Sequence, residues 1–287
     1  MIQYYMTNER GKMISFDRSS PFRIIDIDGL SENKVKLTES DSSNRVGSNV
    51  SNVFVQSNSI TIEGDMKESE ANHRTMLDVL LPGVLCRLFR RDSTTHQELY
   101  VEGYLTSTPN ISVKKRVYQP FQFVLRTPYP YWRDASKNLM NFSTLESMFR
   151  FPCSFSSTLP WKISSRNMNQ LSNIVNKGSV PVGFIAHFKA TDTVRGPELL
   201  KVLTQERIKF TTLSMQVGDE LIVSTIDNQC YCRLIRDEVE TNVFFNMDFE
   251  ATFFQLDVGE NPLRFDASYG KNNLEVSIEY ATTYAGV

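Results

Sequence analysis

The chain has 287 residues, a formal net charge of −2 and a pI of about 6.0, which excludes the basic excess of proteins that grip nucleic acid through its phosphates. Hydrophobic residues make up 40% and charged residues 22%, so we expect a globular chain with one large domain or two of ordinary size. The sequence has no charged N-terminal leader followed by an apolar run, as a signal peptide would, and no apolar run long enough to span a membrane. We therefore expect synthesis in a reducing host cytoplasm, no membrane attachment and four free thiols, at Cys86, Cys153, Cys230 and Cys232.

The first half predicts short strands around one helix. A run of isoleucines at 24–27 ends at the turn signal Asp28-Gly29, and residues 59–64 alternate apolar and polar side chains as a half-buried strand does. Between them, residues 30–58 are rich in Ser, Asn, Asp and Glu. We interpret this stretch as a long loop or an extended arm.

Residues 70–81 predict the one clear helix of the chain. Ser69 is a plausible N-cap, and Pro82-Gly83 ends the pattern. Three leucines, Leu77, Leu80 and Leu81, recur at helical spacing and predict its buried stripe.

Three further strands are expected at 85–90, 98–107 and 119–126, and a proline-rich aromatic segment then interrupts the sheet pattern. Two prolines restrict sheet pairing at this point, so we predict a domain junction packed by five residues. These are Pro128, Tyr129, Pro130, Tyr131 and Trp132. The predicted domains are 1–134, a β domain with the helix 70–81, and 135–287, a β-sandwich.

The second half predicts strands at roughly ten-residue intervals, separated by turn signals, which is typical of a sandwich or jelly roll. The segment from Gly259 to Pro262 is interpreted as one of these turns, and residues 135–158 as irregular. The expected strands are 181–189, 207–212, 220–226, 230–236, 252–256 and 274–280.

The sequence offers no catalytic, cofactor-binding or metal-binding constellation. His73, His96 and His187 stand apart from one another and from the cysteines, so surface or core positions fit them better than ligand roles. Cys230 and Cys232 lie two residues apart on an expected strand, and we expect both to pack in the sandwich. The basic triplet 114–116 is interpreted as a solvated turn.

Several segments together resemble the siphovirus distal tail protein family. The resemblance rests on Asn72 to Gly83, Phe121 to Trp132, Asn176 to Gly183, Val217 to Val223, Phe253 to Pro262 and Leu274 to Val287, in this order along nearly the whole chain. It implies a mostly β fold: an N-terminal β-barrel or sandwich domain with one helix, and a C-terminal galectin-like β-sandwich.

The same resemblance implies a structural virion protein of the tail tip and baseplate rather than an enzyme. Its N-terminal domain would form a homo-oligomeric ring of six copies that joins the major tail protein to the tail-associated hub protein. Receptor-binding protein would attach to the outer domain, and DNA would pass through the lumen without specific binding. No cofactor is implied.

Two other functions remain open at this point. The runner-up is a carbohydrate-binding baseplate adhesin, which would use aromatic patches on the sandwich domain. The third is a cell-wall glycosidase, which needs two carboxylates facing each other across a cleft.

Overall fold

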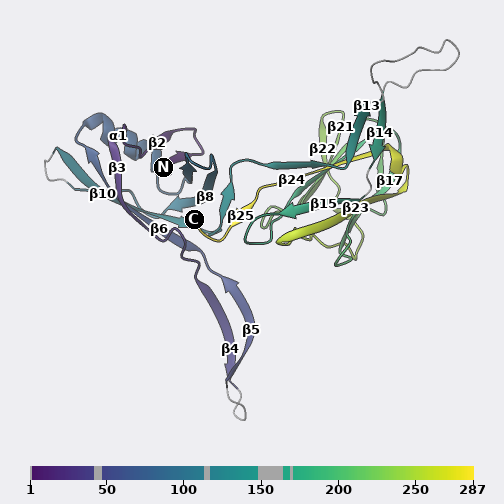
Figure 1. The fold of residues 1–287 in the computed structure, drawn as a ribbon, viewed down its shortest axis with the longest axis horizontal. Coiled ribbons are helices and arrows are strands. Elements are labelled where there is room, and N and C mark those ends of the chain that lie inside the picture. Colours follow the sequence, from purple (N-terminus) through teal and green to yellow (C-terminus); the bar gives the residue numbers. More distant parts are fainter. Residues whose placement is uncertain (1, 42–46, 113–116, 148–163, 169–170) are drawn as a thin grey trace. The chain divides into compact units, whose positions relative to one another are not determined.

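The computed structural model describes residues 2–41, 47–112, 117–147, 164–168 and 171–287 (Figure 1). As expected, the fold is mostly β, and the described residues contain a single α-helix. Contacts divide the chain into two compact units. The first comprises Met1–Ser136 and Thr283–Val287, and the second comprises Lys137–Thr282.

The first unit is built on one antiparallel sheet with the strand order β2-β1-β7-β8-β10-β6-β3. Short strands β9, β11 and β25 join it beside this path. The strands are β1 Ile2–Asn8, β2 Met13–Ser15, β3 Phe22–Asp28, β6 Asn58–Lys67, β7 Leu85–Asp92, β8 Glu98–Leu105, β9 Asn110–Ile111, β10 Tyr118–Thr127, β11 Trp132–Asp134 and β25 Thr283–Tyr284.

One face of this sheet and the helix α1 Glu70–Val79 supply the core of the first unit. Phe121, Phe123 and Leu125 of β10 all point into it, as their alternation predicts. Gly64 of β6 lies beneath the Phe121 ring, where a Cβ would approach Cζ to 2.5 Å, so only glycine leaves room for that ring.

The helix begins where the sequence predicts, but its buried stripe differs. Ser69 occupies the N-cap position with extended backbone, although its side chain makes no capping hydrogen bond. Met76, Val79 and Leu80 are buried, whereas Leu77 is exposed, so the expected stripe was wrong at that residue. Met76, Val79 and Leu80 follow the three- and four-residue spacing of one helix face, and Leu77, the next residue after Met76, points away from that face.

The second unit packs two main sheets around one core, as a sandwich does. Their orders are β12-β24-β16-β20-β21-β22 and β15-β23-β17-β18, with β19 pairing β17, and β13 and β14 form a separate pair. The strands are β12 Asn138–Asn141, β13 Ser143–Ser147, β14 Ser164–Met168, β15 Leu171–Asn176, β16 Ile185–Ala190, β17 Val194–Lys201, β18 Arg207–Lys209, β19 Ser214–Met215, β20 Glu220–Ser224, β21 Tyr231–Arg236, β22 Val239–Asn242, β23 Gly259–Tyr269 and β24 Leu274–Tyr280.

Several second-half expectations need correction. The segment expected as a turn from Gly259 begins β23, and Pro262 lies inside that strand opposite Asn173. Residues 252–256 form only an isolated bridge at Leu256, and part of the region expected as irregular forms β12 and β13. Strands β15 and β17 were not predicted, because polar residues interrupt their apolar alternation.

The last residues of the chain belong to the first unit, which corrects the expected division at 134/135. Thr283 and Tyr284 pair with Arg133 and Trp132, so β25 returns to β11. That the two units fold independently stays a prediction. Within the described residues, no helix combines the length and apolar character needed to cross a membrane.

Candidate assembly surfaces

A two-stranded hairpin stands apart from the main sheet of the first unit, within the stretch 30–58 that was expected to be a long loop or an extended arm. We call it the arm; it consists of β4 Val35–Asp41 and β5 Ser48–Val55, which form a sheet of their own. Every side chain of β5 is exposed. An isolated two-stranded hairpin is only marginally stable in water, so this element needs a partner surface.

One face of the arm is apolar over most of its length. Val35 lies opposite Val55 and Leu37 opposite Val53, and successive side chains of a strand alternate between faces. After a register shift at Thr38/Glu39, Val50 lies opposite Glu39. The exposed apolar residues of this face are Val35, Leu37, Val50, Val53 and Val55, whereas Phe54, opposite Lys36, lies on the other face. An exposed apolar face of this kind marks an interaction surface.

The base of the arm is tied to the C-terminal segment. Ser31 Oγ donates to the Val287 carbonyl oxygen at 2.9 Å, and the Asn33 side-chain amide donates to the Ala285 carbonyl. Gln56 N donates to the Lys34 carbonyl oxygen at 2.8 Å and closes the hairpin. The chain end therefore helps to fix the point from which the arm leaves the first unit.

The predicted junction residues from Pro128 to Trp132 pack within the first unit. Trp132 is fully buried in its core, and its indole Nε1 donates to the Leu30 carbonyl oxygen at 2.9 Å. The rings of Tyr129 and Tyr131 meet edge to face at 5.2 Å, and Pro130 is buried while Pro128 is exposed. A role for the five residues in packing two domains together stays a prediction.

The sheet face opposite the core combines stacked aromatics with paired charges. Tyr5, Phe89 and Tyr100 lie side by side on β1, β7 and β8, with the first two rings stacked at 4.5 Å. Burial, and then the hydrogen bond to Glu98, raise the pKa of the Tyr5 hydroxyl to about 12.

Rows of opposite charge flank these aromatics on the same face. Arg87 Nε lies 2.8 Å from Glu102 Oε1, and Arg91 Nε lies 2.9 Å from Glu98 Oε1, each pair directly opposite across β7 and β8. Arg133 reaches Glu102 from β11 at 3.2 Å. We call this surface the arginine–glutamate face; Arg87 and Arg133 share Glu102, and Arg91 pairs with Glu98, so each arginine contacts a carboxylate.

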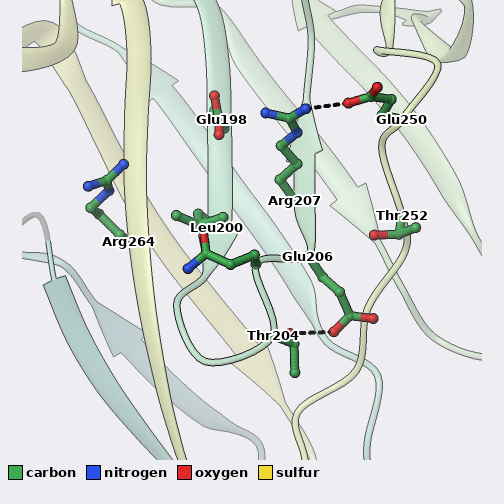
Figure 2. A pocket seen from close by; sticks show the side chains of 9 residues that line it. Glu198, Leu200, Thr204, Glu206, Arg207, Glu250, Thr252 and Arg264 are labelled. Carbon is green, nitrogen blue, oxygen red and sulfur yellow. Dashed lines mark hydrogen bonds and ion pairs between the residues drawn. The ribbon is translucent and has the colours of Figure 1, made fainter.

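In the second unit, a polar pocket of about 570 Å³ opens on the β15-β23-β17-β18 sheet (Figure 2). Arg207 Nη2 lies 2.5 Å from Glu250 Oε2, and Thr204 Oγ1 donates to Glu206 Oε2 at 2.6 Å (Figure 2). The described lining contains no aromatic side chain, so it offers no platform on which a sugar ring would stack. The geometry does not favour the adhesin alternative at this pocket. The lining residues are Glu198, Leu200, Thr204, Gln205, Glu206, Arg207, Glu250, Thr252 and Arg264.

The two neighbouring cysteines differ in environment. Cys232 is buried in the sandwich core, but Cys230 precedes β21 and is exposed, so the expectation that both pack inside was wrong for Cys230. Among the described residues, no group of three His, Cys, Asp or Glu side chains is arranged to hold a metal ion. Cys153 and the triplet 114–116 lie outside the described residues.

Two of the three histidines make specific contacts. His73 Nε2 lies 2.7 Å from Gln119 Oε1, and His187 Nδ1 lies 2.9 Å from Glu220 Oε1. His96 lies in a turn with a left-handed backbone, at φ 55°. The histidines are thus on separate elements of the fold, and each contact is with a single polar side chain.

The sequence of the second unit matches a family model described as the C-terminal domain of the siphovirus-type tail component, over residues 177–284. The resemblance to siphovirus distal tail proteins is confirmed. A comparison with curated proteins gave no match. The similarity to distal tail (Dit) proteins therefore rests on this domain match and on the fold.

Solved structures agree at the level of the fold. The Dit protein of phage SPP1, described as a paradigm of the hub adsorption apparatus in phages that infect Gram-positive bacteria, aligns with a TM-score of 0.66 at 8% identity, covering 98% of each chain. A chain of the phage P2 baseplate in its activated conformation with Ca aligns with a TM-score of 0.56 at 12% identity. The corresponding structure with Sr aligns with a TM-score of 0.55 at 13% identity. Both baseplate matches cover 100% of both chains.

Proposed function

We propose that this Dit-like protein is a structural connector of the virion tail tip, without enzymatic activity. Its first unit forms a homo-oligomeric ring of six copies that joins the major tail protein to the tail-associated hub protein. Its second unit lies on the outside of the ring and holds receptor-binding protein. Assembly takes place in the host cytoplasm. The family match and the baseplate and hub context of the similar structures support this assignment.

The arm is the observation that carries the proposal. Its apolar face, with Val35 opposite Val55 and Leu37 opposite Val53, is covered by no described part of its own chain. A closed ring needs a heterologous interface, in which one patch of a subunit meets a different patch of its neighbour. An arm that reaches a neighbour supplies one half of such an interface and leaves no arm free once the ring closes.

Passage of DNA is compatible with the charges of the first unit. Each phosphate neutralised by a free lysine or arginine strengthens non-specific binding and slows ejection. On the arginine–glutamate face, Arg91 pairs with Glu98, while Arg87 and Arg133 share Glu102, so most of the positive charge of this face is offset. The chain as a whole carries a net charge of −2.

The arm interface is tested by sedimentation velocity of the full chain over a range of concentrations. The paired change Leu37→Ser and Val53→Ser removes two facing apolar side chains and should shift the assembly towards monomer. The control Leu203→Ser changes a leucine of the second unit that is more exposed than Leu37 and should leave the distribution unchanged. Equal assembly of the wild type and the arm variant would contradict the role of the arm.

A further inference from the structure

Three exposed phenylalanines lie on one loop of the second unit, directly after β22. We call residues 243–250 the phenylalanine loop. Phe245 and Phe249 are 95% and 106% exposed, and Phe244 is 48% exposed. Single exposed apolar side chains are normal on a protein surface, but a group of them on one loop marks a surface that binds another protein.

Hydrogen bonds hold this loop in place before any partner binds. Phe244 N donates to Asn242 Oδ1 at 3.0 Å, and the Asn246 side-chain amide donates to Thr212 Oγ1 at 2.9 Å. Asp248 N donates to the Lys209 carbonyl oxygen at 2.8 Å, and the Phe244 ring stacks on Phe253 at 6.0 Å. A preorganised loop loses little conformational entropy when its exposed rings are covered.

The strand that leads into the loop is an edge strand. β22 ends the order β12-β24-β16-β20-β21-β22, and all four of its side chains are exposed. Val243 N donates to the Cys232 carbonyl oxygen at 3.1 Å, so the pair Val243 and Cys232 is a hydrogen-bonded pair of the β21–β22 ladder. Hydrogen-bonded and non-hydrogen-bonded pairs alternate in an antiparallel ladder, so the backbone groups of Glu240 and Asn242 point to the free edge.

The charges around this edge select the partner. From 237 to 250 the chain has five acidic residues and no basic one, namely Asp237, Glu238, Glu240, Asp248 and Glu250. Arg233 and Arg207 pair with Glu240 and Glu250, which leaves an acidic surplus at the turn and in the loop. Nucleic acid, anionic lipid and anionic cell-wall polymers are repelled by such a surface, and phenylalanine offers a sugar hydroxyl no hydrogen-bonding group.

We propose that β22 and the phenylalanine loop bind an extended segment of another protein of the tail tip. The segment adds as a strand to β22, with apolar side chains at alternate positions and basic residues at its ends. Backbone hydrogen bonds form with Glu240 and Asn242, while Phe244 and Phe245 cover the apolar side chains. The proposed function enters only in naming a tail-tip protein as the source, because ring assembly uses the first unit.

The test uses 15-residue peptides tiled across the other structural proteins of the same virion, with the full-length chain as the receptor. We expect binding peptides to alternate apolar residues between basic ends. In hydrogen exchange, the Glu240 and Asn242 amides should become protected on binding. Phe245→Ser should weaken binding at least tenfold, whereas Val217→Ser, at an exposed valine in a different turn of the second unit, should not.

Two variants of Glu240, one to proline and one to threonine, distinguish strand addition from simple apolar contact. Glu240→Pro and Glu240→Thr both remove the ion pair with Arg233, but only the proline removes the outward N–H. We expect Glu240→Pro to weaken binding at least tenfold relative to Glu240→Thr. The proposal is overturned if no tiled peptide binds, if the two variants bind alike, or if β22 instead mediates dimers of this chain. Loss of the ring with peptide binding intact would count against the proposed function alone.

Discussion

The indole Nε1 of Trp132 donates a hydrogen bond to the carbonyl oxygen of Leu30 at 2.9 Å, joining the strand β11 to the segment that leads into the arm. Because Trp132 also pairs with Tyr284 of β25, one residue connects the base of the arm with the C-terminal segment.

Trp132 should therefore be a principal support of the first unit. Trp132→Ala removes a fully buried aromatic side chain and should lower the free energy of unfolding by about 3–5 kcal/mol. Trp132→Phe keeps most of the ring volume but loses the Leu30 hydrogen bond, at a cost of about 1–3 kcal/mol. Denaturant unfolding measures both. Tyr269→Phe, at an exposed tyrosine of the second unit, is the control. Equal stability of Trp132→Ala and the wild type would refute this role.

The returning C-terminus gives a second prediction, about the two units. Removing residues 283–287 deletes β25 and the Tyr284 and Val287 contacts with the core, which should destabilise the first unit by about 2–4 kcal/mol. The second unit should unfold as before. Hydrogen exchange resolved along the chain measures the stability of each unit separately. Replacing residues 283–287 with a Gly/Ser tail of equal length controls for chain length.

Limited proteolysis checks the division itself. Cleavage near Ser136 and Lys137, within the expected junction at 128–158, should leave two resistant fragments of similar size, because these two residues are exposed and mark the boundary between the units. A single resistant core that runs across the boundary between Ser136 and Lys137 would show that the units do not fold separately.

Asp219 should make the second unit acid-sensitive. Its buried carboxylate accepts hydrogen bonds from Arg236, at 2.5 Å from Nη2, and these bonds hold the pKa of Asp219 below its usual value. Because this pKa is lowered on folding, the stabilisation is present above the unfolded pKa of about 3.9 and is lost as pH falls through the folded pKa. The measurement is unfolding free energy from about pH 6 to pH 2 for the wild type and Asp219→Asn. The gap between them should be widest above about pH 5 and should close towards acid; a constant gap would contradict the linkage.

The thiols should differ sharply in reactivity. Burial raises the pKa of Cys232 to about 12 and of Cys86 to about 11, so both remain protonated and shielded at neutral pH. Cys230 is exposed and should react first with a thiol reagent. Mass spectrometry of the alkylated native protein identifies the sites, and among Cys86, Cys230 and Cys232 the early modification should be at Cys230 alone. A disulfide involving these cysteines, or stoichiometric zinc by elemental analysis, would contradict the expected free, metal-free thiols.

The parts of the fold that were predictable have strong local patterns. Val276, Ile278 and Tyr280 alternate with exposed residues, and the strand at 274–280 was predicted with the bounds that β24 has. Pro82-Gly83 likewise marks the region where the helix ends. Pro262 misled the prediction because proline usually interrupts a sheet, yet β23 accommodates it opposite Asn173.

The candidate surfaces were harder to predict, because their apolar residues lie outside any core. Val35 and Leu37 alternate as a strand requires, but the surrounding Ser, Asn and Glu residues left open whether this stretch is a long loop or an extended arm. Phe245 and Phe249 gave an apolar signal that usually means burial, and exposure is visible only once the strands around them are known. The return of β25 depends on tertiary pairing that no local pattern specifies.

Electron microscopy of the purified full-length chain, at high concentration and together with its hub partner, tests the central claim most directly. The account predicts closed rings of six copies in which each arm covers a neighbouring first unit, and a lumen with few unpaired lysines and arginines. Particles that remain monomers or twofold dimers under both conditions would contradict the ring. Rings with a lumen lined by unpaired Lys and Arg would contradict free passage of DNA.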